Sequence, residues 1–406
     1  MLPLCTAAQK SQRAIKKEIS QARDKVKEGK NLDKVEASMR KLLKDSANRD
    51  NVKIWNVLIE AVRGQYAQAN EKLYLKQKQD TAALFKLASQ LFTDACSLDT
   101  IDAHPNKKGR VVPVYRQRNA HNLMIIRPNL YHGGYYFIMK GNYQEAYHLF
   151  SQYIDCARQP LFSSIHADEL GKWMPQAAYG AMYCGNRMDC PGKVLRYKEV
   201  AQQDTAHLDR VWQFMCEAYY QLGDTVNYVN TLRKGVSKYP AYPYFFPRLV
   251  AYEQHRGRED EAKKVVDRAL ATDSTNVIFL LGKCSVLLNL GQYDECIRLS
   301  RHLVEQDDSL ADAHYYAGLS FFNKAILQEK KLMLSELTKK QRQKARGKIM
   351  ALYEQSRPYL ERYRQLSPKD VHKWSAPLYT IYFNLNMGKE FDEIDKLRNE
   401  YRKHIK

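Results

Sequence analysis

The sequence predicts an all-α chain built from stacked pairs of antiparallel helices. Glycine and proline are scarce, at 18 and 13 of 406 residues, and long runs of Leu, Ala, Lys, Glu and Gln favour helix. Gly223, Gly257 and Gly291 follow one another at intervals of 34 residues, each between two apolar segments. Glycine ends a helix well because it accepts a positive φ just after the last turn. Equal spacing of such breaks is typical of a helical repeat.

The N-terminal part is expected to be helical from residue 10 to about residue 100, with divergent repeats as one interpretation. Ile15, Ile19 and Ala22 recur on one face of a first helix, and Asn31 is expected to precede a second. Residues 101–127 contain two prolines and a glycine, and from residue 104 onward they hold six basic residues and no acid, which indicates a basic connecting loop. A new helix is expected to begin within it, at about Asn119.

Residues 1–9 allow two interpretations. Thr6, Ala7 and Ala8 are small residues of the kind that precede a signal-peptidase site, so the segment is read as the remnant of a signal peptide. The charged start and most of the apolar stretch of such a peptide are not in the sequence. The alternative is a disordered tail. No apolar run approaches the roughly 18 residues of a membrane-spanning helix.

From residue 128 to residue 406 helix pairs recur, interrupted by a charged helical insertion at about 323–349. The turn glycines are accompanied by residues at repeating positions: Trp212, Tyr219, Leu222, Leu232, Pro240, Leu249, Ala262, Ala269, Leu270, Leu290 and Tyr293, with Gly134, Gly141, Tyr143, Ala146 and Phe150 earlier and Gly318, Tyr353, Pro368, Trp374 and Gly388 later. In spacing and residue type this part resembles the tetratricopeptide repeat (TPR) superfamily. The stretch RPNLYHGGYYFIMKGNYQEAYHLF also resembles uncharacterised secreted TPR proteins of Gram-negative bacteria.

The resemblance implies a right-handed α-solenoid of helix hairpins whose first helices line a concave groove for a peptide or a partner protein. By repeat phase the groove would present Arg210, Gln213, Glu217, Tyr220, Tyr244, Gln254, His255, Ser285, Asn289, Asp312 and Tyr315. The TPR subset that grips a terminal carboxylate has lysines and asparagines at phases that here hold Gln213, Glu217, Pro247, Ala251, Leu281 and Ser285. That carboxylate clamp is therefore not expected. Plain solvation is the alternative for each groove residue.

The sequence contains no motif that indicates a reaction, a cofactor site or a metal site. It contains no Gly-rich phosphate loop, no HExxH and no GxSxG. The 8 cysteines include no CxxC pair, and Cys184 and Cys190 around an expected turn are read as two free thiols rather than a disulfide. Glu259, Asp260 and Glu261 follow the Gly257 turn, where they complement a helix N-terminus. An enzyme is not expected.

The net charge of +20 is localised in segments 1–50, 104–127 and 323–364. Solvated helix faces explain most such charge, and no nucleic-acid motif accompanies it, so nucleic acid is not an expected partner. The sequence thus predicts a non-enzymatic protein-binding scaffold, periplasmic or secreted, with a cytoplasmic location as the alternative. The alternative function is binding of an acidic polymer or a membrane surface through segments 104–127 and 323–364, as a peripheral envelope protein.

Overall fold

The computed structural model describes residues 12–105 and 108–405, and every regular element in these ranges is helical. The all-α prediction is therefore confirmed for the described ranges, and the expectations for residues 1–9 lie outside them. The chain divides into two compact units, Met1–Tyr228 (unit 1) and Val229–Lys406 (unit 2). The division falls inside one helix and differs from the predicted start of the repeat array at residue 128.

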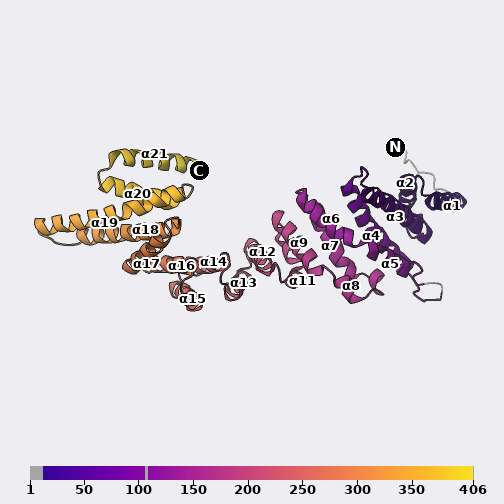
Figure 1. Ribbon diagram of the computed structural model, residues 1–406, viewed down its shortest axis with the longest axis horizontal. Helices are drawn as coiled ribbons and strands as arrows, with labels where there is room; N and C mark the ends of the chain where they lie inside the picture. The colour runs from indigo at the N-terminus through magenta and orange to yellow at the C-terminus, as the bar shows by residue number, and fades with distance from the viewer. Residues whose placement is uncertain (1–11, 106–107, 406) are drawn as a thin grey trace, which may run out of the picture. The chain divides into compact units, whose positions relative to one another are not determined.

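Unit 1 contains consecutive helices that pack as antiparallel neighbours (Figure 1). α2 packs on α3, α3 on α4, α6 on α7, and α9 on both α7 and α10. The helices are α1 (Gln12–Glu28), α2 (Leu32–Leu43), η1 (Ser46–Asn48), α3 (Val52–Tyr74), α4 (Thr81–Asp102), α5 (Arg116–Ile126), α6 (Pro128–Met139), α7 (Tyr143–Asp155), η2 (Cys156–Arg158), η3 (Pro160–Phe162), α8 (Ala167–Gly171), α9 (Met174–Arg187), α10 (Pro191–Leu195), α11 (Lys198–Ala201) and α12 (Leu208–Gln221), and α13 (Thr225–Lys238) spans the division.

Side-chain caps fix where several of these helices begin. The carboxylate of Asp80 accepts from the backbone N–H of Ala82 at the start of α4, and the amide oxygen of Asn142 accepts from Glu145 at the start of α7. Such caps satisfy N–H groups that have no partner inside the helix. Asn31 precedes α2, as predicted, but makes no side-chain cap. Local sequence thus defines the helix ends on which the hairpins depend.

The segment 101–127 is partly helical. α5 begins at Arg116, three residues before the predicted start at Asn119. Its first turn is tied to the end of α4, because Asp99 accepts two bonds from Arg116 at 2.7 and 2.9 Å, and Asp102 accepts the backbone N–H of Tyr115 at 2.8 Å. Arg116 therefore serves to join two helices rather than to form an open basic surface.

Unit 2 continues the hairpins. α14 pairs with α15, α16 with α17, α18 with α19 and α20 with α21, and the first helices α14, α16, α18 and α20 contact one another in series. Their bounds are α14 (Phe245–His255), α15 (Glu259–Thr272), α16 (Val277–Asn289), α17 (Tyr293–Gln306), α18 (Ala311–Met333), α19 (Lys339–Leu366), α20 (Val371–Asn384) and α21 (Gly388–Ile405). The predicted insertion lengthens α18 and α19, which lie side by side (Figure 1).

The glycines predicted to form hairpin turns have positive φ. Gly223, Gly257 and Gly291 have φ of 69°, 67° and 72°, and Gly141 has 71°. At Gly291 the backbone N–H donates to Leu288 O, and the next N–H donates to Leu287 O, which satisfies two carbonyls at the end of α16. The 34-residue spacing is therefore the spacing of equivalent turns, as predicted.

Small residues allow the helices to approach closely. A Cβ added to Gly318 on α18 would lie 2.7 Å from Cγ of Leu360 on α19. Beside it the hydroxyl of Ser356 donates to the Gly318 carbonyl at 2.7 Å. Large side chains fill the spaces between hairpins, as Phe246 and Phe279 do with ring centroids 4.8 Å apart. Each such buried side chain contributes about 1.5–3 kcal/mol.

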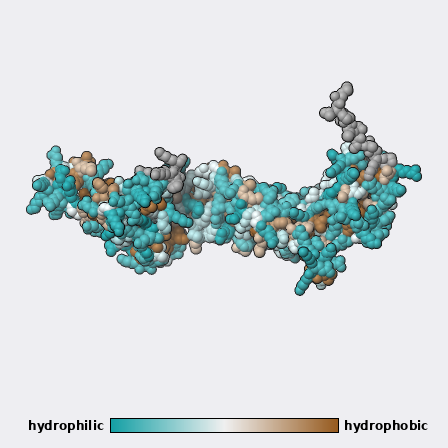
Figure 2. Space-filling model, turned by 90° about the horizontal axis from the view of Figure 1, so that it is seen from above, coloured by the Kyte–Doolittle hydropathy of each residue, from teal (hydrophilic) through white to brown (hydrophobic). Residues whose placement is uncertain are grey.

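The seven cysteines within the described ranges are free thiols, including Cys184 and Cys190. No helix there is long and apolar enough to span a membrane. On the face shown in Figure 2 hydrophilic residues predominate, and hydrophobic residues form small separate patches. Recognition on that face would therefore rely on polar groups and on local cavities rather than on one large apolar surface.

Candidate functional site

The predicted groove residues lie on first helices of the hairpins. In unit 1 they are Arg210, Gln213, Glu217 and Tyr220 on α12. In unit 2 they are Tyr244, Gln254 and His255 on α14 and its N-cap, Ser285 and Asn289 on α16, and Asp312 and Tyr315 on α18. The structure joins some of these residues through polar contacts and places others elsewhere.

In unit 2, side chains of α14, α15 and α16 form a polar row, defined as Gln254, Glu259, Ser285 and Asn289. Ser285 Oγ donates to Gln254 Oε1 at 3.2 Å, and Gln254 Nε2 donates to Glu259 Oε2 at 3.4 Å. Asn289 Nδ2 donates to Glu259 Oε1 at 3.5 Å. These distances are long for hydrogen bonds, so the bonds are weak. The members are half-buried or exposed, which leaves them open to exchange with a ligand.

On α12 two of the predicted residues are engaged in packing between hairpins. Glu217 accepts from Asn186 Nδ2 on α9 at 2.6 Å and from Gln213 Nε2 at 2.9 Å. Tyr220 is 71% exposed, and its ring centroid lies 5.4 Å from that of Tyr228. The short bonds around Glu217 hold α9 against α12, so this pair is less available for exchange than the polar row.

The remaining predicted residues differ in exposure. Tyr244 is buried, with its ring against Phe245 and the Arg248 guanidinium 3.8 Å from its centroid. His255 and Asp312 are exposed. Tyr315 is half-buried, and burial raises the pKa of its hydroxyl. Repeat phase alone did not show that Tyr244 is buried at the N-cap of α14, where it packs against Phe245 and Arg248.

The basic segment 104–127 uses much of its charge inside unit 1. Arg116 pairs with the buried Asp99, Arg118 contacts Glu60 and Asn56, and Arg127 is 2% exposed. A side chain already enclosed by carboxylates or carbonyls does not attract a distant anionic surface. Arg116, Arg118 and Arg127 therefore have structural roles.

The second basic segment is an exposed hairpin, the basic hairpin, defined as residues 323–349 at the far ends of α18 and α19. It contains nine Lys or Arg residues and two Glu residues. Among its described side chains, Lys324 alone forms an ion pair, with Asp294. At its end Met333 and Leu334 are 83% and 81% exposed. Thr338 and Gln341 close the loop with a capping box at the start of α19.

A cavity of about 530 Å³, not foreseen from the sequence, lies in unit 2 among α13, α14, α15 and α16. Apolar side chains, among them Val236, Leu249 and Phe279, form its walls. Glu253 on its floor is buried and pairs with Arg233 and Arg258 at 3.2 and 2.6 Å. Glu253 and Arg258 stand on either side of Gly257 in the sequence, but this local pairing does not indicate a cavity.

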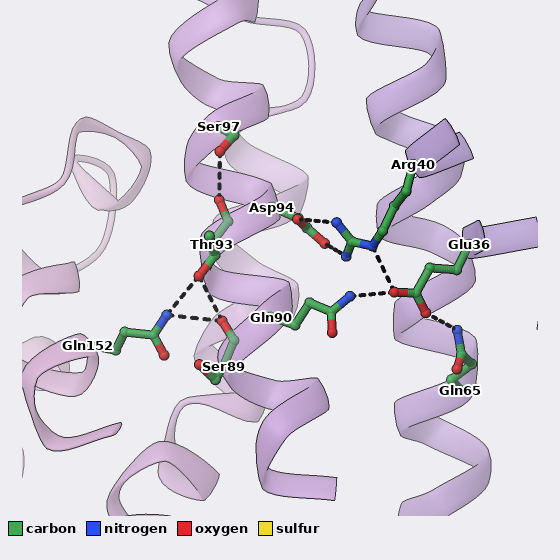
Figure 3. Close-up of polar contacts among 9 residues, drawn as sticks. All are labelled: Glu36, Arg40, Gln65, Ser89, Gln90, Thr93, Asp94, Ser97 and Gln152. Carbon is green, nitrogen blue, oxygen red and sulfur yellow. Dashed lines mark hydrogen bonds and ion pairs between the residues drawn. The ribbon is translucent and has the colours of Figure 1, made fainter. Parts of the chain in front are cut away.

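In unit 1, polar side chains join α2 and α3 to α4 (Figure 3). Arg40 donates to Asp94 and Glu36, and Glu36 also accepts from Gln65 and Gln90. Burial alone would raise the pKa of Glu36, but the three donated bonds and the Arg40 charge outweigh it and lower the pKa. Because its carboxylate is charged and engaged on both oxygens, Glu36 connects helices and is not a free general base.

No protein-family model matches the sequence, and no curated protein matches it. Solved structures do match. The C-terminal part of a TPR repeat-containing protein from Cytophaga hutchinsonii is 11% identical with a TM-score of 0.42, over 65% of this chain and 92% of that chain. A human IFIT1 dimer with m7Gppp-AAAA is 14% identical at 0.39, over 96% and 73%. Yeast Tom70 is 13% identical at 0.31, over 87% and 91%. At these values the likeness carries no functional assignment.

The repeat of helix pairs within the chain itself identifies the fold. Helix pairs follow one another along the chain. The turns inside three successive pairs each contain a glycine with positive φ, and these glycines are 34 residues apart. The fold is an all-α repeat of helix hairpins with the turn spacing that is typical of tetratricopeptide repeats. In a TPR array the first helices line one face of the stack, and in unit 2 the polar row lies on two of them and on the first residue of α15. Within the described residues no group of three or more His, Cys, Asp or Glu side chains could hold a metal ion.

Proposed function

We propose that this TPR protein is a non-enzymatic scaffold that binds an extended peptide along the first-helix face of unit 2. The observation that carries the proposal is the polar row, whose amides and hydroxyl are held to one another only by bonds of 3.2 to 3.5 Å. An extended peptide offers backbone N–H and C=O groups in a row. Gln254, Ser285 and Asn289 supply both donors and acceptors for them.

Exchanging the hydrogen bonds within the polar row for hydrogen bonds to a peptide is favourable where the bonds to the peptide are shorter. A typical hydrogen bond contributes about 0.5–1.5 kcal/mol net, and tenfold affinity corresponds to about 1.4 kcal/mol. If Gln254, Ser285 and Asn289 each gain one hydrogen bond to the backbone of the bound peptide, the three bonds together are sufficient to select the register in which the peptide binds. Exposed His255 and Asp312 at the two ends of the face would contribute to sequence preference.

The test selects peptides on the purified full chain from a random peptide library and then measures their affinity for variants. We expect the triple variant Gln254→Ala, Ser285→Ala, Asn289→Ala to bind the selected peptides at least about tenfold more weakly. The matched control changes exposed residues of α17, His302→Ala and Gln306→Ala, and should bind as the parent does. Equal affinity of the triple variant, or failure to select any peptide, would contradict the proposal.

A second candidate function is binding to an anionic membrane surface through the basic hairpin. Met333 and Leu334 form an exposed apolar tip, and the lysines on either side have no ion-pair partners among the described residues. Each Lys or Arg near an anionic bilayer contributes about 1 kcal/mol, and an apolar tip adds burial among the lipids. The tip favours a lipid surface over a nucleic acid, for which no stacking or base-reading motif is present.

The membrane proposal is tested by co-sedimentation with phosphatidylcholine vesicles with and without phosphatidylglycerol. Binding should require phosphatidylglycerol and weaken as salt is raised. Met333→Ser with Leu334→Ser should weaken binding at every salt concentration. Met139→Ser, which changes an equally exposed methionine of α6, should not. Binding that ignores the anionic lipid, or that survives the tip variant unchanged, would exclude this function.

For location we infer the periplasm or the cell exterior, which rests on the resemblance of residues 127–150 to secreted TPR proteins. Fractionation of cells that express the chain from its complete gene tests this inference. Recovery in the periplasmic or secreted fraction supports it, whereas recovery with cytoplasmic markers favours the cytoplasmic alternative.

A further inference from the structure

A cavity of about 550 Å³ opens in unit 1 among α4, α7 and α10. One stripe of α7 forms its floor, with Tyr147, Ser151 and Asp155 at steps of four residues. Thr93 and Ser97 of α4 form one wall, and the other wall is basic. Figure 3 shows Gln152 reaching from α7 to Ser89 and Thr93 on α4, which fixes the floor against the first wall.

Two hydroxyl groups on the floor are buried without a hydrogen bond. Tyr147 and Ser151 are 7% and 8% exposed, and in the part of the chain that the structure describes neither hydroxyl makes a hydrogen bond of good geometry, although each lies near the other and Tyr147 lies near Arg196. A buried hydroxyl without a partner destabilises the fold. Buried hydroxyl groups that lack a hydrogen bond and lie at the floor of a cavity therefore indicate a site for a ligand with hydrogen-bond acceptors.

Positive charge faces the same floor. Lys193 Nζ lies 5.0 Å from the Tyr147 ring centroid, donates to Gln144 Oε1 at 2.9 Å and forms no ion pair with any described residue. Arg196 donates to Asp155 Oδ2 at 2.8 Å, and the same oxygen accepts from Tyr197 at 2.9 Å. The carboxylate of Asp155 is thus already engaged, while Lys193 and the other N–H groups of Arg196 remain as donors.

The Tyr147 hydroxyl stays protonated and can donate. Burial raises its pKa, and the interactions of the hydroxyl with Ser151 and with the Arg196 guanidinium oppose this only in part. Two hydroxyl donors, Lys193 and the Arg196–Asp155 ion pair therefore line one space, in which Lys193 is the cation without an acidic partner among the described residues. This is the donor set of an oxyanion site, in which charge-assisted bonds are the strong ones.

We propose that this cavity binds the oxyanion group, carboxylate or phosphate monoester, of a small organic molecule. Lys193 supplies the counter-charge, and the remaining N–H groups of Arg196 and the hydroxyls of Tyr147 and Ser151 donate hydrogen bonds to the anionic oxygens. The volume exceeds that of the anion alone and falls in the usual range for small-molecule sites. The site is independent of the peptide-binding face proposed above, since it lies on second helices of unit 1.

The test measures the melting temperature and the binding heat of the full chain with inorganic phosphate and, separately, with acetate, at constant ionic strength set by chloride. We expect saturable stabilisation by one of the two, and which one identifies the anion class. Lys193→Gln should weaken that binding at least tenfold. Lys140→Gln is the matched control, because Lys140 lies 5.8 Å from the Tyr136 ring centroid but outside the cavity, and it should leave binding unchanged.

Tyr147→Phe separates a ligand-binding role from a structural one. Because the hydroxyl has no partner, the variant without ligand should melt at the same or a higher temperature than the parent, yet bind the anion more weakly. A lower melting temperature without ligand would show that the hydroxyl is structural. That result, equal loss of binding in Lys140→Gln, or no stabilisation by either anion beyond that of chloride would overturn the proposal.

Discussion

At the scale of single residues, Arg127 is a buried cation that pairs with no carboxylate of the described residues. Its guanidinium donates to the carbonyl oxygens of Tyr153 at 3.0 Å, Leu170 at 2.8 Å and Glu169 at 3.3 Å. It also contacts Cys156 Sγ at 3.2 Å, and burial raises the pKa of that thiol although Arg127 opposes the effect. The thiol therefore stays neutral. Backbone carbonyls and the Tyr153 ring, 3.9 Å from the guanidinium carbon, stabilise the charge.

We predict that Arg127→Met lowers the free energy of unfolding by about 2–4 kcal/mol, because it leaves buried carbonyls without donors. Arg127→Lys should cost a similar amount, since an ammonium lacks the planar fork that reaches three carbonyls at once. Urea unfolding measures both. Arg63→Met, at an exposed position of α3, should stay within about 0.5 kcal/mol of the parent. If Arg127→Met unfolded with the same free energy as the parent, water would be replacing the guanidinium without loss of stability, and the prediction would be wrong.

Repeat phase predicted which helix face some of the candidate site residues occupy, and their role in binding stays a prediction. It placed Gln254, Ser285 and Asn289 on one face, and the structure joins them into the polar row. It gave no sign of the roles of Arg127 or Tyr147. Both depend on irregular or distant segments: the carbonyls after residue 168 for the first, and the short helix α10 for the second. Periodicity reports which face a side chain occupies, not what a neighbouring hairpin places against it.

At the scale of elements, several hairpin turns contain one left-handed residue each. The equivalent turns use Gly291 after α16, Asn386 after α20 and Asp189 after α9, with φ of 72°, 55° and 51°. Gly291→Val should destabilise the protein by more than about 1 kcal/mol, because a branched side chain is strained at positive φ. Gly291→Asn should cost much less, as the chain's own use of Asn386 indicates. Thermal unfolding compares them, and an unchanged melting temperature for the valine variant would refute the turn assignment.

Most of the fold was accessible from sequence because hairpin turns and helix faces are local signals. The regular units around Gly223, Gly257 and Gly291 were predicted with their turns in the right places. Gly388 was taken as a repeat remnant, but it begins α21 and the left-handed residue of that turn is Asn386. The irregular stretch between α7 and α9 was not predicted. Its short helices are held by long-range contacts such as those of Arg127, which no local pattern encodes.

At the scale of the whole molecule, the array divides into two units although the repeat pattern continues. Each hairpin of a repeat protein contacts mainly its neighbours, so stability is close to a sum of local terms. In unit 2, α16 contacts α14, α15, α17 and α18. A destabilising substitution at the end of α16 should therefore lower the local stability of these helices. It should have less effect on α3 and α4, which belong to unit 1.

We predict that Gly291→Val changes amide hydrogen exchange locally. Exchange in α16, α17 and α18 should become about 5–30-fold faster, which corresponds to a local loss of one or two kcal/mol. Exchange in α3 and α4 should stay as in the parent, and Gly291→Asn should show a smaller change in the same helices. Uniform acceleration across both units would show that the chain opens as one cooperative body. The same measurement with a selected peptide bound would then protect the polar row first, because Gln254 and Ser285 lie on adjoining first helices.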